Sequence, residues 1–317
     1  MTRAILSRLL QAVPVFLVIS VLVFAAVHVA PGDPITNSLA GILSQEAIDK
    51  IRQEYGLDQS IVVQYFAWLK QLFQLNWGYS LVRRVPVFDL IGPAFLNTLL
   101  LTGAAVLICS VFGVLIGIVA GLRRGGVLDR GTMAVVQLAH NLPVFFLGLL
   151  LIWVFGVKLR WLPTSGMYDM RGDQGWVDAA RHLILPAISA AFVSMLVLAR
   201  LIRASTIEIM ASDHIRTYRS QGFGPAQLIG RHLLRSLAAP IVNMTGLQIG
   251  YLMSGVVFIE AVFNWPGIGT LLYAAAAGRD YPVVMAGVML VTGCYLIINL
   301  VTDIILDLLN PRLRANA

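Results

Sequence analysis

Long apolar runs separated by shorter polar stretches dominate the pattern of this chain. A helix that crosses a bilayer needs about 20 mostly apolar residues, and its backbone must be hydrogen-bonded internally across the hydrocarbon. Six runs reach this length, and they lie at approximately 10–30, 94–122, 132–157, 183–205, 240–262 and 283–308. The pattern predicts an all-α membrane protein with six transmembrane helices.

Composition agrees with this interpretation. Of the 317 residues, 58% are hydrophobic and 12% are charged, whereas about 25% are charged in ordinary soluble domains. A net charge of +7 in a soluble chain would suggest nucleic-acid binding. Here the basic residues are distributed by membrane side and do not gather on one face. We therefore expect membrane lipid, and no nucleic acid, around this chain.

The distribution of charge predicts the orientation. If the N-terminus is cytoplasmic, the inner pieces hold 13 Lys and Arg residues against five acidic residues, and the outer pieces hold ten against 11. This asymmetry follows the positive-inside rule, so both termini are predicted to be cytoplasmic. The first run follows Arg3 and Arg8, as a signal peptide would. It exceeds the length of a signal-peptide core, however, and Pro31 follows the one suitable cleavage site, so a span is favoured.

The spans divide the chain into three segments: an N-terminus with the first span at 1–30, an outer segment at 31–92 and a five-helix core at 93–317. The outer segment contains two helix-like stretches, 46–55 and 61–75, and is predicted to form a small extracytoplasmic helical subdomain. The second stretch has an apolar stripe that suits packing on the outer ends of the spans or lying in the membrane interface.

The inner segment at 206–236 is much longer than a connection between two spans requires. It contains a polar, basic helix that begins near Asp213 and ends before Gly222, where a residue without a Cβ suits the turn. A docking surface for a soluble partner and a basic connector that binds anionic lipid heads both fit this pattern.

The stretch from Asp213 to Gly222 resembles the cytoplasmic coupling loop of binding-protein-dependent ATP-binding-cassette (ABC) importer permeases, most closely the dipeptide, oligopeptide and nickel branch. Further short motifs fit this branch, in the same order, from end to end. They are Pro31-Gly32-Asp33-Pro34, Gly56-Leu57-Asp58, Trp161-Leu162-Pro163, Glu260 to Gly269, Arg279-Asp280-Tyr281-Pro282 and Asn310-Pro311-Arg312.

The resemblance implies the type I importer permease fold in the bacterial inner membrane. It also implies a second homologous permease subunit, two ABC ATPase subunits that bind ATP and Mg, and an extracytoplasmic solute-binding protein. The implied cargo is peptide, with nickel or a metal chelate as the alternative. The implied ATPase-coupling residues are Asp213, Arg216, Thr217, Tyr218, Arg219, Gly222, Phe223 and Gly224.

Two positions of this loop depart from the family's pattern. Tyr218 stands where a small residue is usual, and Gln221 stands where a lysine is usual. A tyrosine at this position is expected to need more room in the groove of the ATPase.

The sequence contains no recognisable ATP-hydrolysing motif and no catalytic motif. A P-loop needs a glycine-rich turn followed by Lys and Ser or Thr, but none of the lysines, Lys50, Lys70 and Lys158, follows a glycine. GxSxG, HExxH and CxxC motifs are absent too. We therefore predict a transporter subunit that is not an enzyme and holds no metal or cofactor. The rival interpretation is a self-contained secondary transporter, for which His140 is the plausible titratable residue inside the membrane.

Polar residues inside the spans are the candidates for the translocation pathway. Gln137, His140 and Asn141 are spaced i, i+3 and i+4, so they share one helical face. Lining of the pathway and hydrogen bonding between helices both fit this stripe. The further pathway candidates are Asn97, Asn243 and Gln248.

Two glycine-containing segments have structural interpretations. Gly113, Gly117 and Gly121 recur at every fourth residue and predict a helix-packing surface. The segment 264–269 contains a proline and two glycines and predicts a turn between the last two spans, with an outer gate or a docking surface as the alternative.

Overall fold

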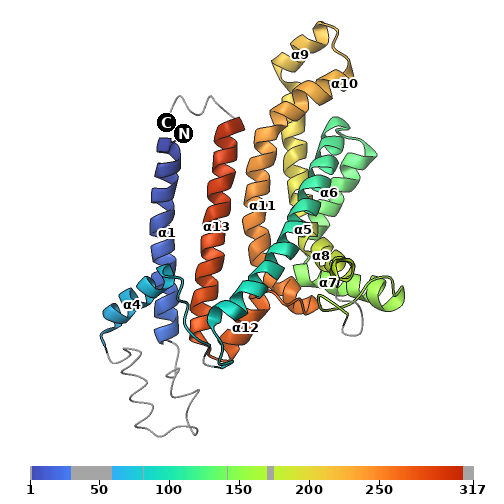
Figure 1. The fold of residues 1–317 in the computed structure, drawn as a ribbon. Coiled ribbons are helices and arrows are strands. Elements are labelled where there is room, and N and C mark those ends of the chain that lie inside the picture. Colours follow the sequence, from blue (N-terminus) through green and yellow to red (C-terminus); the bar gives the residue numbers. More distant parts are fainter. Residues whose placement is uncertain (1, 30–58, 81, 141, 170–174, 310–317) are drawn as a thin grey trace. The chain divides into compact units, whose positions relative to one another are not determined.

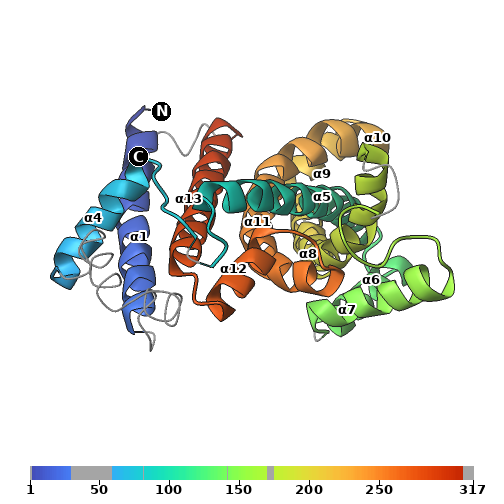
Figure 2. The same cartoon turned by 60° about the horizontal axis from the view of Figure 1, so that its bottom comes forward.

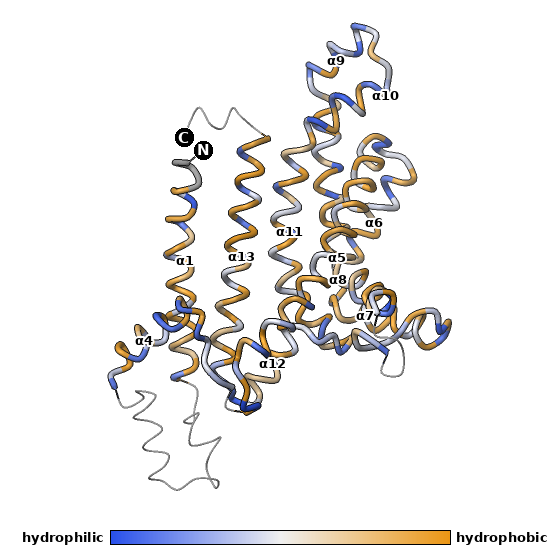
Figure 3. Tube along the Cα trace, viewed as in Figure 1, coloured by the Kyte–Doolittle hydropathy of each residue, from blue (hydrophilic) through white to orange (hydrophobic). Residues whose placement is uncertain are grey.

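The computed structural model describes residues 2–29, 59–80, 82–140, 142–169 and 175–309. The regular elements in these ranges are helices, apart from one isolated bridge between Tyr79 and Pro86. Five of the described helices are long and apolar enough to cross a membrane. They are α1 (Thr2–Val29), α5 (Val87–Leu122), α8 (Trp176–Ala211), α11 (Leu234–Phe263) and α13 (Tyr281–Leu309). Figure 3 shows apolar residues along most of their length.

The predicted third span, 132–157, is divided. Helix α6 (Val127–His140) is followed by α7 (Val144–Leu151), which continues as the π-helix η1 (Ile152–Lys158). The two parts are bent by 106° relative to each other. Proline lacks an N–H and disfavours helical backbone in the residue before it, so Pro143 accounts for the start of a new helix. By length and composition, the described residues hold six candidate spans if this bent pair counts as one and five if it does not.

The chain forms two compact units, one from Met1–Leu96 with Gly267–Ile297 and the other from Asn97–Pro266 with Ile298–Ala317. In the second unit, α8 lies at the centre and packs against α6, α7 and α11, as Figures 1 and 2 show. The largest fully buried side chains of its core are Leu101, Leu185, Leu198, Ile202, Leu233, Leu237, Ile259, Phe263 and Trp265.

The first unit contains α1, the start of α5, most of α13 and two shorter helices, α4 (Ile61–Phe73) and α12 (Ile268–Ala277). Buried side chains of α5, α12 and α13 form its core, among them Val87, Ile91, Ile268 and Val283. Helix α4 begins where the sequence predicts the second outer helix. The first predicted stretch, 46–55, lies outside the described residues.

Helix α4 packs along the side of α1. The hydroxyls of Ser20 and Tyr65 are hydrogen-bonded at 2.8 Å. The ring of Phe24 contacts Tyr65 at 5.4 Å and Trp68 at 5.6 Å between ring centroids. The contacts extend from His28, next to the end of α1, where Nε2 lies 3.2 Å from Gln64 Oε1, to Phe16, whose ring contacts Phe73 at 6.0 Å, so α4 lies along the second half of the spanning helix.

Candidate functional site

The inner segment that the sequence singles out forms a compact loop between α8 and α11. It contains α9 (Asp213–Ser220), the short α10 (Pro225–Gln227) and the π-helix η2 (Leu228–Leu233), which runs directly into α11. Figure 1 shows α9 and α10 beyond the ends of α8 and α11, and Figure 3 shows how hydrophilic this part of the chain is.

The end of α9 is a glycine C-cap. Gly222 has φ +86°, a left-handed conformation that favours glycine. Its N–H donates to Arg219 O at 3.0 Å, and the N–H of Phe223 donates to Tyr218 O at 3.1 Å. These bonds satisfy carbonyl groups that the end of the helix would leave unpaired. The sequence position of Gly222 therefore corresponds to a sharp change of chain direction.

Helix α9 has one buried face and one exposed face. Ile215 is fully buried, and α9 packs through this face against η2 and α8. Asp213 and Arg216 approach to 3.8 Å, but their side chains are 98% and 77% exposed, so the pair contributes little stability. The exposed members of the predicted coupling set are Asp213, Arg216, Thr217, Arg219 and Gly222.

Three predicted coupling residues, Tyr218, Phe223 and Gly224, are half-buried. Tyr218 stacks on the ring of His232, with 3.9 Å between the centroids and 26° between the planes. Phe223 meets the same imidazole edge-on at 5.7 Å and Tyr218 at 5.4 Å. The loop itself thus accommodates the tyrosine. The expectation that Tyr218 needs extra room in a partner's groove has no support in this geometry.

An ion pair that was not predicted from the sequence links the start of α6 to α8. Asp129 is buried and accepts hydrogen bonds from the Arg203 guanidinium, the Nη2 to Oδ2 distance being 2.8 Å. The N–H of Gly125 donates to the same carboxylate at 2.8 Å. A carboxylate in the first turn of a helix, directly after a Gly-Gly turn, was the available signal. The pair fixes the turn between α5 and α6 against α8.

Of the polar stripe predicted on the third span, the structure describes Gln137, which is exposed. The side chain of His140 and the whole of Asn141 lie outside the described residues. The neighbouring face of α6 packs on α8, where Val136 and Ala139 are buried with Leu196. Gln137 is therefore on a face of α6 that this packing leaves uncovered.

Helix α11 carries an exposed stripe with polar members. Asn243, predicted as a pathway residue, is exposed, whereas Gln248 is half-buried. Residues spaced three or four apart extend the Asn243 face along the helix. The stripe consists of Asn243, Leu247, Tyr251, Ser254 and Phe258. Tyr251 and Ser254 are not among the pathway residues predicted from the sequence, although their spacing from Asn243 was a usable signal.

The remaining pathway candidate, Asn97, has a structural contact. Its Nδ2 donates to Pro266 O at 2.9 Å, and Trp265 Nε1 donates to Asn97 O at 3.0 Å. Trp265 is fully buried, and Asn264 ends α11 in a left-handed conformation with φ 47°. Glu260, also fully buried, accepts a hydrogen bond from the Thr98 hydroxyl. These bonds fasten residues 264–266 to α5, which favours the turn over a gate.

The glycine row of α5 lies against α8. A Cβ built on Gly117 would lie 2.6 Å from Ala199 O, and one built on Gly113 would lie 2.9 Å from Met195 O. At Gly121 the nearest atom is Cβ of Thr206 at 2.7 Å. All three distances are shorter than side chains tolerate, so the two backbones approach closely because these residues are glycine.

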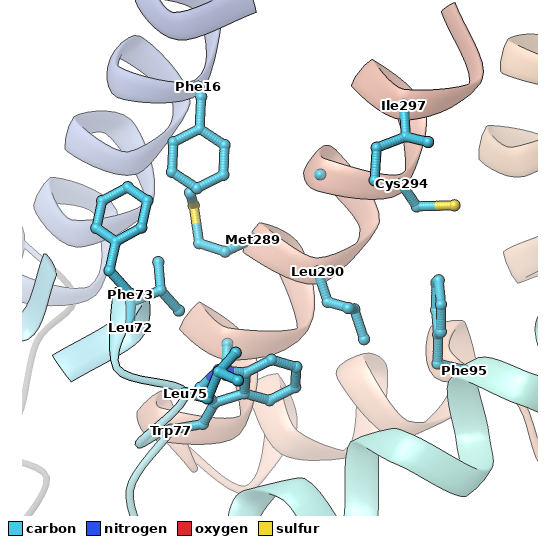
Figure 4. A pocket seen from close by; sticks show the side chains of 12 residues that line it. Phe16, Leu72, Phe73, Leu75, Trp77, Phe95, Met289, Leu290, Cys294 and Ile297 are labelled. Atoms are coloured by element: carbon cyan, nitrogen blue, oxygen red, sulfur yellow. The ribbon is translucent and has the colours of Figure 1, made fainter. Parts of the chain in front are cut away.

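An apolar cavity of about 310 Å³ lies within the first unit, between α1, α4 and α13. Its walls include Phe16, Phe73, Leu290 and Cys294 (Figure 4). None of the described residues that line it is charged. A peptide has a charged amino and a charged carboxyl group, and burying either without a partner is costly. This cavity is therefore unsuited to peptide, and the exposed stripe of α11 is the better candidate for contact with a polar solute.

Comparisons with known proteins agree with this architecture. Residues 113–315 match the family described as binding-protein-dependent transport system inner membrane component. Residues 1–102 match the family of the N-terminal part of such membrane components. The solved inward-facing MetNI methionine ABC transporter is similar in fold to 70% of this chain and 97% of its own chain, with a TM-score of 0.59 and 19% identity.

Curated relatives align over nearly the whole chain. The di/tripeptide transport system permease protein DppB of Pseudomonas aeruginosa (strain UCBPP-PA14) is 36% identical, and 99% of each chain is covered. The glutathione transport system permease protein GsiC of Escherichia coli (strain K12) is 37% identical, again with 99% of each chain covered. This chain therefore belongs to the family of inner-membrane permease components of binding-protein-dependent ABC importers, and it is a transport subunit, not an enzyme.

Proposed function

We propose that this chain forms half of a translocation pathway for peptides and that partner ATPases drive it through α9. The observation that carries the proposal is the exposed basic face of α9, built between the inner ends of two spanning helices. Helix α9 is attached to both spanning helices, because only Ser212 separates it from α8 and because it packs on η2, which is continuous with α11.

The proposed pathway runs along α11. Asn243, Tyr251 and Ser254 offer hydrogen-bonding groups on an exposed face of a spanning helix. Polar groups at membrane depth are costly toward lipid, so such a face suits a water-filled path. A path needs walls on every side. The proposal therefore includes a second, homologous permease subunit that completes it, and two ATPase subunits that bind ATP and Mg.

The proposed orientation puts α9 and both termini in the cytoplasm. The excess of Lys and Arg on that side supports it. An extracytoplasmic binding protein would then deliver the cargo to the opposite ends of the spans. Short peptides are the proposed cargo, because peptide is the chemistry common to the names of the di/tripeptide and glutathione permeases.

A bulky residue at Gly222 tests the docking step. Gly222 is exposed and its surroundings are open, but its φ is +86°, so Gly222→Trp both strains the turn that ends α9 and changes the surface offered to a partner. We expect this variant to insert in the membrane but to lose co-purification with the ATPase. The control is Gly78→Trp, which places the same ring at another exposed glycine with a left-handed conformation (φ +80°) and open surroundings. Normal peptide uptake by Gly222→Trp would contradict the assignment of α9.

Competition between cargoes tests the substrate class. The complete transporter with its binding protein is supplied with a labelled dipeptide, in the presence of an excess of tripeptide, glutathione or nickel. We expect tripeptide or glutathione to compete and nickel not to compete. No uptake of the labelled dipeptide, together with uptake of labelled nickel, would replace peptide with metal as the cargo.

A further inference from the structure

Three aromatic rings join the two sides of the inner loop. Tyr218 is on α9, Phe223 follows the glycine cap, and His232 is on η2. The imidazole lies between the two other rings, stacked on Tyr218 at 3.9 Å and edge-on to Phe223 at 5.7 Å. We call this group, Tyr218, Phe223 and His232, the ring clamp. All three side chains are half-buried, so the contacts are partly desolvated.

The chain bends at both ends of α9, so its backbone connections alone do not fix the orientation of this helix. At the start of α9, Ser212 is extended, with φ −69° and ψ 153°. At its end, the chain turns at Gly222, with φ +86°, and Gly224 is extended, with φ −70° and ψ 160°. Rotation of the backbone at Ser212 and at Gly222 to Gly224 would let α9 change its angle relative to α8 and α11. An isolated helix of eight residues is also too short to be stable alone in water.

Side-chain contacts with the neighbouring elements must therefore hold α9 in a fixed orientation. Ile215 supplies a buried apolar contact on the inner face of the helix. The ring clamp supplies the contact nearest the end of α9, one turn beyond Ile215. A stacked pair fixes both the distance and the angle between two elements, whereas a single aliphatic contact fixes the distance alone.

His232, the member of the ring clamp that is not on the α9 side, belongs to the continuous helix formed by η2 and α11. His232 is in η2, and the chain passes from η2 into α11 in helical conformation at Leu234. A displacement of His232 is therefore a displacement of the inner end of α11. The same helix carries the exposed stripe with Asn243 and Tyr251 further along its length.

We propose that the ring clamp makes α9 and the inner end of α11 move as one body, and that Tyr218 is the positioning residue that transmits motion of the ATPase to the pathway. This inference rests on the proposed function. It gives the tyrosine a role inside this chain, in place of a direct contact with the ATPase. Loss of the clamp should therefore uncouple transport from ATP hydrolysis without preventing assembly.

The first experiment compares single variants in the complete transporter, reconstituted with its binding protein. Tyr218→Ala and His232→Ala should retain the ATPase on purification and hydrolyse ATP within about twofold of the unaltered protein, while uptake per ATP falls about tenfold through the lost ring contacts. Tyr218→Phe and His232→Phe preserve a ring and should stay within about twofold. The double alanine variant should be no worse than either single variant, because the clamp is already open.

Cross-linking keeps the test independent of folding defects. In a chain with Cys109→Ala and Cys294→Ala, Tyr218→Cys and His232→Cys are combined. A short cross-linker that reacts with two thiols should restore uptake per ATP, because it replaces the stack with a covalent tie. A reagent that reacts with one thiol should not restore it.

The possible results distinguish failure of the ring clamp from failure of the proposed function. Unchanged uptake per ATP in Tyr218→Ala, or no recovery on cross-linking, overturns the ring clamp. Loss of the ATPase from Tyr218→Ala with retention in His232→Ala also overturns it, since Tyr218 would then contact the ATPase directly. If the unaltered chain binds no ATPase, the proposed function itself fails, and the ring clamp with it.

Discussion

At Gly117 the approach of α5 to α8 leaves no space for a side chain. A Cβ there would lie 2.6 Å from Ala199 O and 2.8 Å from Ile202 Cβ, and both neighbours belong to a buried helix that cannot yield easily. Small-residue spacing reveals such a surface in a sequence, but it does not identify the partner helix. The identity of the opposing residues comes only from the fold.

We expect Gly117→Leu to lower the apparent melting temperature in detergent, because overpacking costs about 1–3 kcal/mol. Gly103→Leu is the matched control. It introduces the same side chain on the same helix, where a Cβ meets no atom within 4 Å. Equal melting temperatures for the two variants would mean that α5 and α8 do not approach closely in the protein.

The buried carboxylate of Glu260 is a second position where we expect a single substitution to lower stability. Glu260→Ala removes the acceptor of the Thr98 hydroxyl at a fully buried position. We expect destabilisation of about 1–3 kcal/mol from the lost buried hydrogen bond. Asp213→Ala removes a carboxylate that is 98% exposed and should leave the melting temperature unchanged. Thermal unfolding of both variants in the same detergent measures the difference.

At the scale of elements, α4 departs most from the sequence-based picture. Tyr65 bonds to Ser20, and Phe73 contacts Phe16 at 6.0 Å. At 1.5 Å per residue, Phe16 lies roughly 20 Å along α1 from its end at Val29. Exposed apolar side chains, among them Val62 and Phe66, face outward from α4. We therefore expect α4 to lie beside the outer half of α1 within the membrane, not beyond the ends of the spans.

Thiol labelling tests the depth of α4. Phe66→Cys and Phe73→Cys are made in a chain with Cys109→Ala and Cys294→Ala. Both introduced thiols should react slowly with a membrane-impermeant maleimide added to spheroplasts. Gln59→Cys, before the start of α4 and exposed, should react quickly. Equally fast labelling at all three positions would place α4 in water.

The exposed stripe of α11 makes a prediction about transport kinetics. Tyr251→Ala and Ser254→Ala should raise the KM for peptide uptake at least threefold while ATPase binding stays intact, because both side chains face the proposed path. Leu107→Ala, at a 66% exposed position on α5, should leave the KM unchanged. Initial uptake rates over a range of peptide concentrations, at saturating binding protein, provide the comparison.

Hydropathy predicts these elements well in their centres and poorly at their ends. Helix α8 runs from Trp176 to Ala211, whereas the predicted span covers 183–205. The ends of α8 contain charged residues, among them Asp178. A hydropathy criterion excludes such residues from a membrane span, but they are compatible with a helix that extends beyond the membrane. The division between α6 and α7 was foreseeable only as a bend at Pro143. Neither the angle nor the π-helix that follows has a signal in the sequence.

At the scale of the whole molecule, the family and the transport role were accessible from the sequence because many short motifs occur in register. The resemblance to binding-protein-dependent permeases is confirmed by family matches at 1–102 and 113–315. The ring clamp was not accessible, because Tyr218 and His232 are 14 positions apart and meet only through the turn at Gly222. The coupling assignments and the pathway residues stay predictions.

The central claim is that this chain is a passive half-pathway moved by partner ATPases. The most direct measurement is uptake of a labelled short peptide into proteoliposomes that contain the chain alone or the chain with its second permease and ATPases, with binding protein supplied. We predict uptake only in the complete assembly with ATP, and loss of that uptake in Gly222→Trp. Uptake by the chain alone without ATP would contradict the account, because it would make this protein a self-sufficient carrier.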